Sequence, residues 1–120
     1  MTKKVLLVDD NPTLLRALGR VLEERFDIET AESGTRALEM LEQEAFDVLI
    51  SDFKMPSMNG IQLVTQVQKE WPNTRCMILT GNQDEDSLNQ ATNIAKAYRL
   101  LLKPMPVTEL INAIEEAVRE

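Results

Sequence analysis

Chemically active side chains follow four short apolar runs of this sequence, at the point where each run ends. Three are carboxylates, one is a hydroxyl and one is an ammonium: Asp9, Asp10, Asp52, Thr80 and Lys103. If the runs are parallel strands of one sheet, their carboxyl ends meet at one edge, where open α/β sheets bind ligands. The five side chains are then expected to face one site.

The expected site favours metal-assisted phosphoryl chemistry. Two carboxylates about 4 Å apart repel each other by roughly 4 kcal/mol at an effective dielectric near 20, so a cation is needed nearby. Lys103 supplies one positive charge, and a divalent ion would supply two. Oxygen ligands favour Mg²⁺ over zinc or copper. Such an ion, an ammonium and a hydroxyl can stabilise a phosphoryl group, which a carboxylate can accept as an aspartyl phosphate.

Each of these residues also has an ordinary structural explanation. Asp9 or Asp10 can cap a following helix. Thr80 precedes a glycine and can belong to a turn, and Lys103 precedes a proline and can be a solvated loop residue. Their joint occurrence at four strand ends favours one shared chemical site over separate structural roles.

Alternating apolar runs and helical patterns predict the elements that position these side chains. Unbroken apolar runs are typical of strands buried on both faces, and helical spacing of apolar residues is typical of amphipathic helices. Strands are expected at residues 5–8, 26–30, 46–51, 76–79 and 98–102, and helices at 12–22, 34–45, 61–68, 84–93 and 107–118. This alternation predicts an α/β fold, a doubly wound five-stranded parallel sheet flanked by five helices, as a single domain over residues 1–120.

Single residues add local expectations. Asn11 and Ser33 stand where N-caps of the first two helices are expected. Cys76 lies within an apolar run and is expected to be a buried small hydrophobic residue. Met55 and Met58 flank the loop after Asp52 and either fill gaps or contact a partner.

Composition excludes several classes of function. The 120 residues include 20 Asp and Glu, 13 Lys and Arg and no His, with a net charge of −7. The acidic balance argues against binding of nucleic acid or anionic lipid by this domain. Without His, neither a Ser-His-Asp triad nor a His-ligated zinc site can form. One cysteine and no long apolar segment predict a cytoplasmic protein without a membrane span.

Four short motifs resemble the receiver domain of two-component response regulators over essentially the whole chain. They are residues 8–11 (Val-Asp-Asp-Asn), 51–60 (Ser-Asp-Phe-Lys-Met-Pro-Ser-Met-Asn-Gly), 79–81 (Leu-Thr-Gly) and 102–104 (Leu-Lys-Pro). The resemblance implies a flavodoxin-like fold with strand order 2-1-3-4-5. It also implies either a stand-alone receiver of the chemotaxis type or the N-terminal receiver of a longer chain.

The resemblance further implies roles for the strand-end residues. Asp52 would accept a phosphoryl group from a histidine kinase or a phosphotransfer protein. Mg²⁺ would bind directly to Asp10, Asp52 and the backbone carbonyl of Lys54, and through water to Asp9. The domain would then be a phosphoacceptor that assists its own phosphotransfer and dephosphorylation, not an enzyme with a separate substrate.

Residues after the fourth and fifth strands complete the implied phosphoryl site. Lys103 would pair with the phosphoryl group, Thr80 would donate a hydrogen bond to it, and Pro104 would follow a cis peptide bond. The absent His is then explained, because the donor imidazole belongs to the partner.

The implied switch departs from the family pattern at one position. In the family, phosphorylation draws the threonine, here Thr80, inward, and an aromatic three residues before the lysine follows. Leu100 occupies that position here, and Tyr98 lies two residues earlier on the same side of the strand. Lys54 and Asn82 occupy the positions that set the phosphoryl lifetime. The face of the fourth helix, fifth strand and fifth helix would control an output partner or domain.

Three other functions fit parts of the sequence. A flavin carrier on the same fold needs a phosphate loop rich in glycine and hydroxyl residues after the first strand, where this chain has acidic residues. A phosphatase of the haloacid dehalogenase type needs a second Asp where Lys54 stands. A degenerate receiver used as a constitutive interaction module is disfavoured by the intact Asp10, Asp52, Thr80 and Lys103 and is slightly favoured by Leu100.

Overall fold

The computed structural model describes residues 2–81, 99–102 and 105–119 of the chain. Within these residues, five strands form one parallel sheet in the order β2-β1-β3-β4-β5. This confirms the order that the family resemblance implies. The strands are β1 (Lys4–Val8), β2 (Asp27–Ala31), β3 (Val48–Asp52), β4 (Arg75–Thr80) and β5 (Arg99–Leu102).

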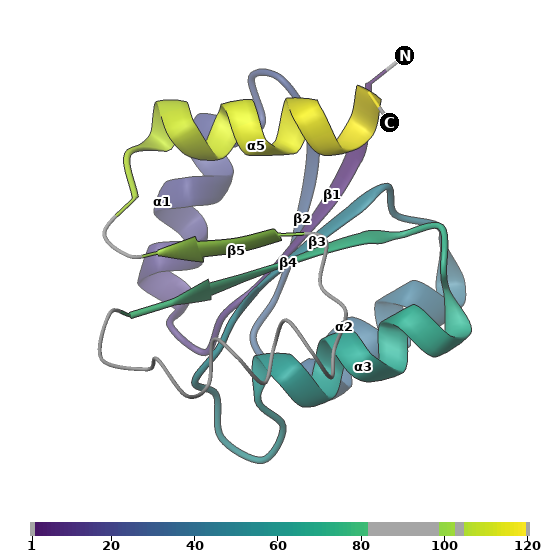
Figure 1. The fold of residues 1–120 in the computed structure, drawn as a ribbon. Coiled ribbons are helices and arrows are strands. Elements are labelled where there is room, and N and C mark those ends of the chain that lie inside the picture. Colours follow the sequence, from purple (N-terminus) through teal and green to yellow (C-terminus); the bar gives the residue numbers. More distant parts are fainter. Residues whose placement is uncertain (1, 82–98, 103–104, 120) are drawn as a thin grey trace.

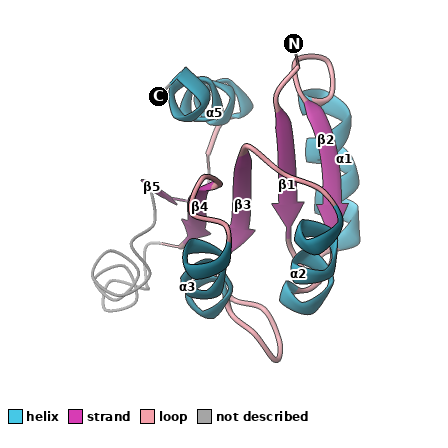
Figure 2. Ribbon diagram, turned by 90° about the vertical axis from the view of Figure 1, so that its right-hand side faces the viewer, coloured by secondary structure: helices cyan, strands magenta, loops and turns pink. Residues whose placement is uncertain are grey.

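Helices cover both faces of the sheet, as the doubly wound prediction requires. In the described part of the chain these are α1 (Pro12–Leu22), α2 (Gly34–Gln43), α3 (Gly60–Glu70) and α5 (Val107–Arg119). The helices α1 and α5 lie on one face, and α2 and α3 lie on the other (Figure 1, Figure 2). The helix predicted at residues 84–93 lies outside the described residues.

The side chains of β1 alternate between two apolar cores. Val5 and Leu7 pack with residues of α1 and α5, whereas Leu6 and Val8 pack with residues of α2 and α3. None of the four is more than 3% exposed. The unbroken apolar run therefore forms a strand buried on both faces, as predicted.

Three of the described helices have a side-chain N-cap, which accepts hydrogen bonds from backbone N–H groups of the first turn. The Asn11 side chain accepts hydrogen bonds from the backbone N–H groups of Thr13 (3.1 Å) and Leu14 (3.2 Å) at the start of α1. Ser33 Oγ accepts one from the Arg36 N–H (3.1 Å) in α2, so both predicted caps are confirmed. At α3, Asn59 and Gln62 exchange two side-chain to backbone bonds in a capping box.

Some predicted boundaries and faces are wrong. The apolar pattern predicts a helix that continues to Ala45, but α2 ends at Gln43 and Ala45 is exposed. Val21 belongs to the apolar pattern of α1 but is 42% exposed. The buried face of this helix is therefore narrower than the apolar pattern of the sequence. The third strand begins at Val48 and not at residue 46. Just before it, the side chain of Asp47 accepts the Lys4 N–H (2.8 Å).

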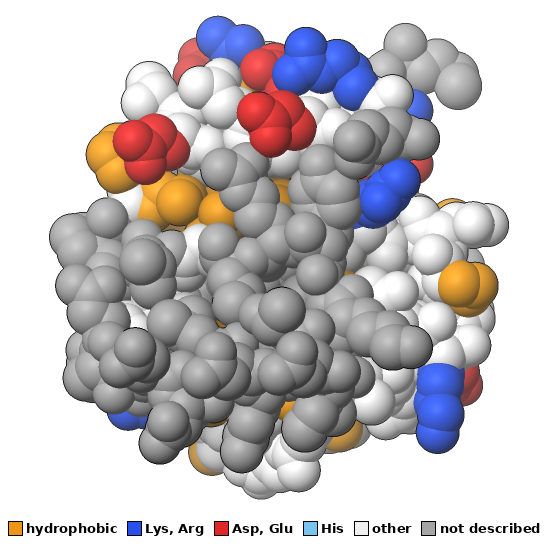
Figure 3. All heavy atoms as spheres, in the orientation of Figure 1, with side chains coloured by type: hydrophobic (Ala, Val, Ile, Leu, Met, Phe, Trp, Pro, Cys, Tyr) orange, Lys and Arg blue, Asp and Glu red, His pale blue; other side chains and the backbone are white. Residues whose placement is uncertain are grey.

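Charge on the described surface is mixed. On the face drawn in Figure 3, both acidic and basic side chains lie at the top of the molecule, over and around α5. Among the described residues, no helix is both long enough and apolar enough to cross a membrane.

Candidate functional site

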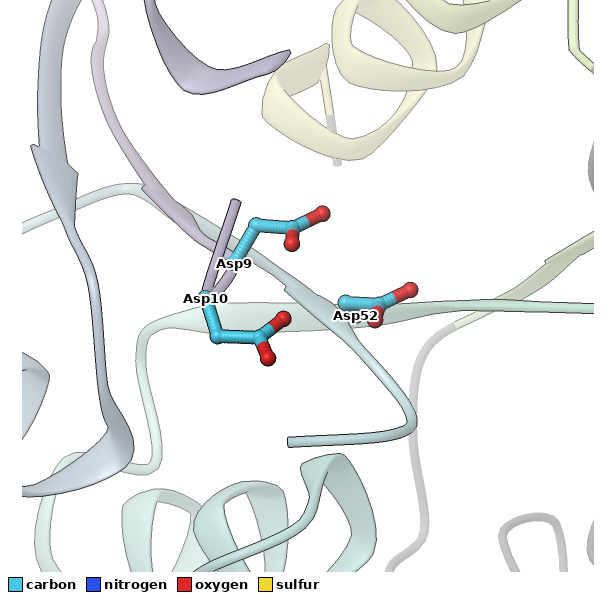
Figure 4. Close-up of side chains that lie close together, drawn as sticks. All are labelled: Asp9, Asp10 and Asp52. Carbon is cyan, nitrogen blue, oxygen red and sulfur yellow. The ribbon is translucent and has the colours of Figure 1, made fainter. Parts of the chain in front are cut away.

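Three aspartates meet at the carboxyl ends of β1 and β3. Asp9 and Asp10 directly follow β1, and Asp52 is the last residue of β3. One carboxylate oxygen from each lies within 4.8 Å of the others (Figure 4). The two strands are neighbours, and Val8 pairs with Ser51. This register brings the residues that follow β1 level with the end of β3, as the strand-end argument predicts.

The cluster combines buried and exposed carboxylates. Asp9 is 6% exposed and Asp52 is 9% exposed, whereas Asp10 faces solvent. Carboxylates this close repel one another, and burial weakens the screening of that repulsion by water. The donor set consists of carboxylate oxygens only, which fits a hard divalent cation such as Mg²⁺. The arrangement can therefore hold a cation with one side open to solvent.

Asp9 is oriented by the backbone around it. Its N–H donates to the carbonyl of Ala31 (3.1 Å), which continues the pairing of β1 with β2. Its Oδ1 accepts a hydrogen bond from the N–H of Asn11 (3.0 Å). The alternative that Asp9 or Asp10 caps α1 is wrong, because the side chain of Asn11 does so. The Asp9 carboxylate is therefore directed to the cluster from the turn before the helix.

Asp52 lies in a tightly fitted stretch of backbone. Its carbonyl accepts a hydrogen bond from Ser51 Oγ (2.9 Å). The next residue, Phe53, donates its N–H to the carbonyl of Leu79 in β4 (2.9 Å) and accepts the N–H of Gly60 (2.8 Å). A Cβ on Gly60 would lie 2.6 Å from the Asp52 carbonyl oxygen. The sequence places Gly60 at the end of the motif over residues 51–60 without a role in the site, and the structure shows that it lies against the backbone of Asp52.

The other predicted site residues are only partly described. Thr80 ends β4 and is 4% exposed; its neighbour Leu79 pairs with Asp52. Lys54 is exposed in the loop between β3 and α3. Leu100 lies in β5 and pairs with Ile78. The remaining predicted residues, Asn82, Tyr98, Lys103 and Pro104, lie outside the described part of the chain.

Comparison with known proteins gives a consistent result. Residues 5–115 match the model of the response regulator receiver domain. The chain is 38% identical over 117 residues to the transcriptional regulatory protein GlrR of Escherichia coli K12, covering 97% of this chain and 26% of that protein. It is 30% identical over 115 residues to the response regulator receiver protein CpdR of Brucella abortus, covering 95% of each.

A solved structure agrees with these sequence matches. The receiver domain protein of Clostridium thermocellum superimposes with a TM-score of 0.90 and 32% identity, covering 98% of this chain and 94% of that one. The chain spans about a quarter of the length of GlrR and nearly all of CpdR. With its strand order, its acidic cluster and the match over residues 5–115, the chain belongs to the family of response regulator receiver domains.

Proposed function

We propose that this domain is a phosphorylation-controlled signalling switch in which Asp52 accepts a phosphoryl group from a histidine kinase or a phosphotransfer protein. One observation carries the proposal: the carboxylates of Asp9, Asp10 and Asp52 lie within 4.8 Å of one another in a receiver domain. A bound cation would offset the repulsion between the three carboxylates. The cation and the carboxylates together would then form a site for an anionic phosphoryl group.

Mg²⁺ is the proposed cofactor. Asp10, Asp52 and the backbone carbonyl of Lys54 would hold it directly, and Asp9 would do so through water. When bound, the ion neutralises the clustered carboxylates and the oxygens of the incoming phosphoryl group.

The nucleophile in this proposal is a carboxylate oxygen of Asp52. It attacks phosphorus as the bond from phosphorus to the donor nitrogen breaks, and the electron pair of that bond returns to the imidazole. The Thr80 hydroxyl donates a hydrogen bond to a phosphoryl oxygen, and Lys103 pairs with the group. The hydrogen bond from Phe53 to Leu79 supports this, because it ties the backbone after Asp52 to β4, the strand that ends at Thr80.

The proposed output step acts through β5 and α5. Movement of Thr80 would reach the surface through Leu100, with Tyr98 as the nearest aromatic, and would alter the face formed by the segment before β5, by β5 and by α5. Lys54 and Asn82 would set the phosphoryl lifetime. The partner would be an effector domain or a separate protein, in a cytoplasmic setting and without direct binding of nucleic acid or membrane by this domain.

A mass measurement tests the proposal. The chain is incubated with MgCl₂ and a small acyl phosphate, and its intact mass is recorded. We expect a gain of one phosphoryl group in the wild type and in the control Asp27→Asn, whose carboxylate is at the opposite end of the sheet. We expect no gain in Asp52→Asn. An unmodified wild type with every acyl phosphate and phosphohistidine donor would refute the proposal.

A further inference from the structure

The loop from Phe53 to Asn59 joins β3 to α3 and carries Lys54, whose carbonyl is a metal ligand in the proposed function. Both ends of this loop are fixed by backbone bonds. Phe53 donates to Leu79 (2.9 Å) and accepts from Gly60 (2.8 Å), which closes the loop on itself. The capping box of α3 begins at Asn59.

The middle of the loop contains a strained turn. Ser57 has φ 69°, the one positive φ of a non-glycine residue in the described part of the chain. The N–H of Met58 donates to the carbonyl of Pro56 (2.8 Å), which closes a γ-turn around Ser57. A γ-turn whose central residue has positive φ is the rarer and strained form. Such strain persists only where neighbouring structure holds the turn in place.

Met58 provides a contact that can hold this turn. Its side chain packs on Gly34, the buried first residue of α2. A Cβ on Gly34 would lie 2.6 Å from Met58 Sδ, 3.0 Å from its Cγ and 3.2 Å from its Cβ. The contact with Gly34 therefore includes Cβ and Cγ of Met58, next to its backbone, as well as the sulfur. Met58 also packs against the core between the sheet and α2 and α3.

We propose that the contact between Met58 and Gly34 is a positioning contact for the cation site: it holds the strained loop so that the Lys54 carbonyl faces the three aspartates. This inference rests on the proposed function, in which that carbonyl is a ligand. Helix α2 then contributes to metal binding without supplying a ligand. If the contact is lost, Ser57 can relax to negative φ, and the loop residues on either side of it, including Lys54, shift.

The test uses Gly34→Ala and its effect on the Mg²⁺ dissociation constant, measured by calorimetry on the folded chain. We expect binding to weaken by about 10-fold, the lower end of the range for residues that orient metal ligands. The matched control is Gly19→Ala in α1, where a Cβ would meet Ile28 and Thr30 at 3.7 and 3.8 Å, an ordinary contact distance. The control should bind Mg²⁺ as the wild type does.

A second variant and a second readout separate positioning from stability. Met58→Ala should weaken Mg²⁺ binding as Gly34→Ala does, and Gly34→Ala should add nothing in the Met58→Ala background, since the contact is then already lost. Amide resonances of Lys54 and Met55, recorded without metal, should move in Gly34→Ala and stay in place in Gly19→Ala. A loss of global stability alone would not produce this local pattern.

The outcomes distinguish the inference from the function on which it rests. A wild type that binds Mg²⁺, together with Gly34→Ala and Met58→Ala chains that bind it equally well, would overturn the positioning contact and leave the proposed function intact. A wild type that binds no Mg²⁺ and accepts no phosphoryl group would overturn both.

Discussion

Gly60, the first residue of α3, lies directly against the backbone carbonyl of Asp52, the last residue of β3. A Cβ at this position would lie 2.6 Å from the carbonyl oxygen and 3.1 Å from the Cα of Phe53. Both atoms belong to the backbone and cannot move aside as the end of a side chain can. The helix that follows the loop therefore approaches the site this closely only because residue 60 has no side chain.

Gly60→Ala should therefore damage both stability and the site. We expect the free energy of unfolding to fall by about 1–3 kcal/mol, the usual cost of overpacking, and modification by an acyl phosphate to slow. Urea denaturation and intact mass measure the two effects. Gly19→Ala is the control, and it should be stabilised, because alanine in a helix is favoured over glycine by roughly 1 kcal/mol. A Gly60→Ala chain identical to wild type in both assays would contradict this reading.

Asn11→Ala should cost stability and spare the metal site. The side chain of Asn11 caps α1, so its loss should lower the free energy of unfolding by about 1 kcal/mol. Asp9 is held by the backbone N–H of Asn11, which alanine retains. Mg²⁺ affinity, measured by calorimetry, should therefore match that of the wild type. A loss of affinity would mean that the Asn11 side chain itself supports the site.

Mg²⁺ should stabilise the folded chain through the aspartate cluster. At a concentration about ten times its dissociation constant, a ligand of the folded state raises the free energy of unfolding by roughly 1.4 kcal/mol. We expect this rise in the wild type and a much smaller one in Asp52→Asn. In EDTA, Asp10→Asn should be more stable than the wild type, because one of three mutually repelling charges is removed. Equal stabilisation of wild type and Asp52→Asn by Mg²⁺ would place the ion elsewhere.

A second charged cluster, at the amino ends of β1 and β2, should respond to pH. Lys4 Nζ lies 3.0 Å from a carboxylate oxygen of Glu44 and 3.4 Å from oxygens of Asp27 and Glu29. A hydrogen bond shared with Glu44, followed by desolvation, raises the pKa of Glu29 above its ordinary value. The same bond, together with Lys4, lowers the pKa of Glu44.

The sign of the effect expected for Glu29 follows from its raised pKa. A raised carboxyl pKa gives stability that is present at low pH and is lost as the group ionises, so Glu29 destabilises the folded chain at neutral pH. Glu29→Gln should therefore be more stable than wild type at pH 7, and the difference should shrink as the pH falls to the ordinary glutamate value of 4.5. Urea denaturation across this range is the measurement. A difference that grows on acidification would contradict the assignment.

Cys76 should be unreactive in the folded chain. It is fully buried in β4, and desolvation raises the pKa of its thiol to about 12. Because the thiolate is the reactive form, iodoacetamide at pH 8 should modify the chain only after denaturation, as read by intact mass. Rapid modification of the native protein would show that β4 opens locally.

Much of this fold follows from local patterns in the sequence. The unbroken apolar run of β1 requires burial on both faces, and Asn11 and Ser33 mark helix starts through bonds to backbone only two or three residues away. The order of residues at the strand ends predicts the acidic cluster, because parallel strands present their carboxyl ends at one edge. These inferences need only short-range chemistry and the rule for parallel sheets.

Other features depend on pairs of residues that are distant in the sequence. The register of Val8 with Ser51 sets how closely Asp9 and Asp52 approach, and no spacing in the chain encodes that register. The contacts of Gly60 with the Asp52 carbonyl and of Met58 with Gly34 likewise appear only after α2 and α3 have packed on the sheet. The sequence by itself thus determined which groups gather at the site. The tertiary structure decided how they fit, because steric fit depends on distances between separate elements that local patterns do not contain.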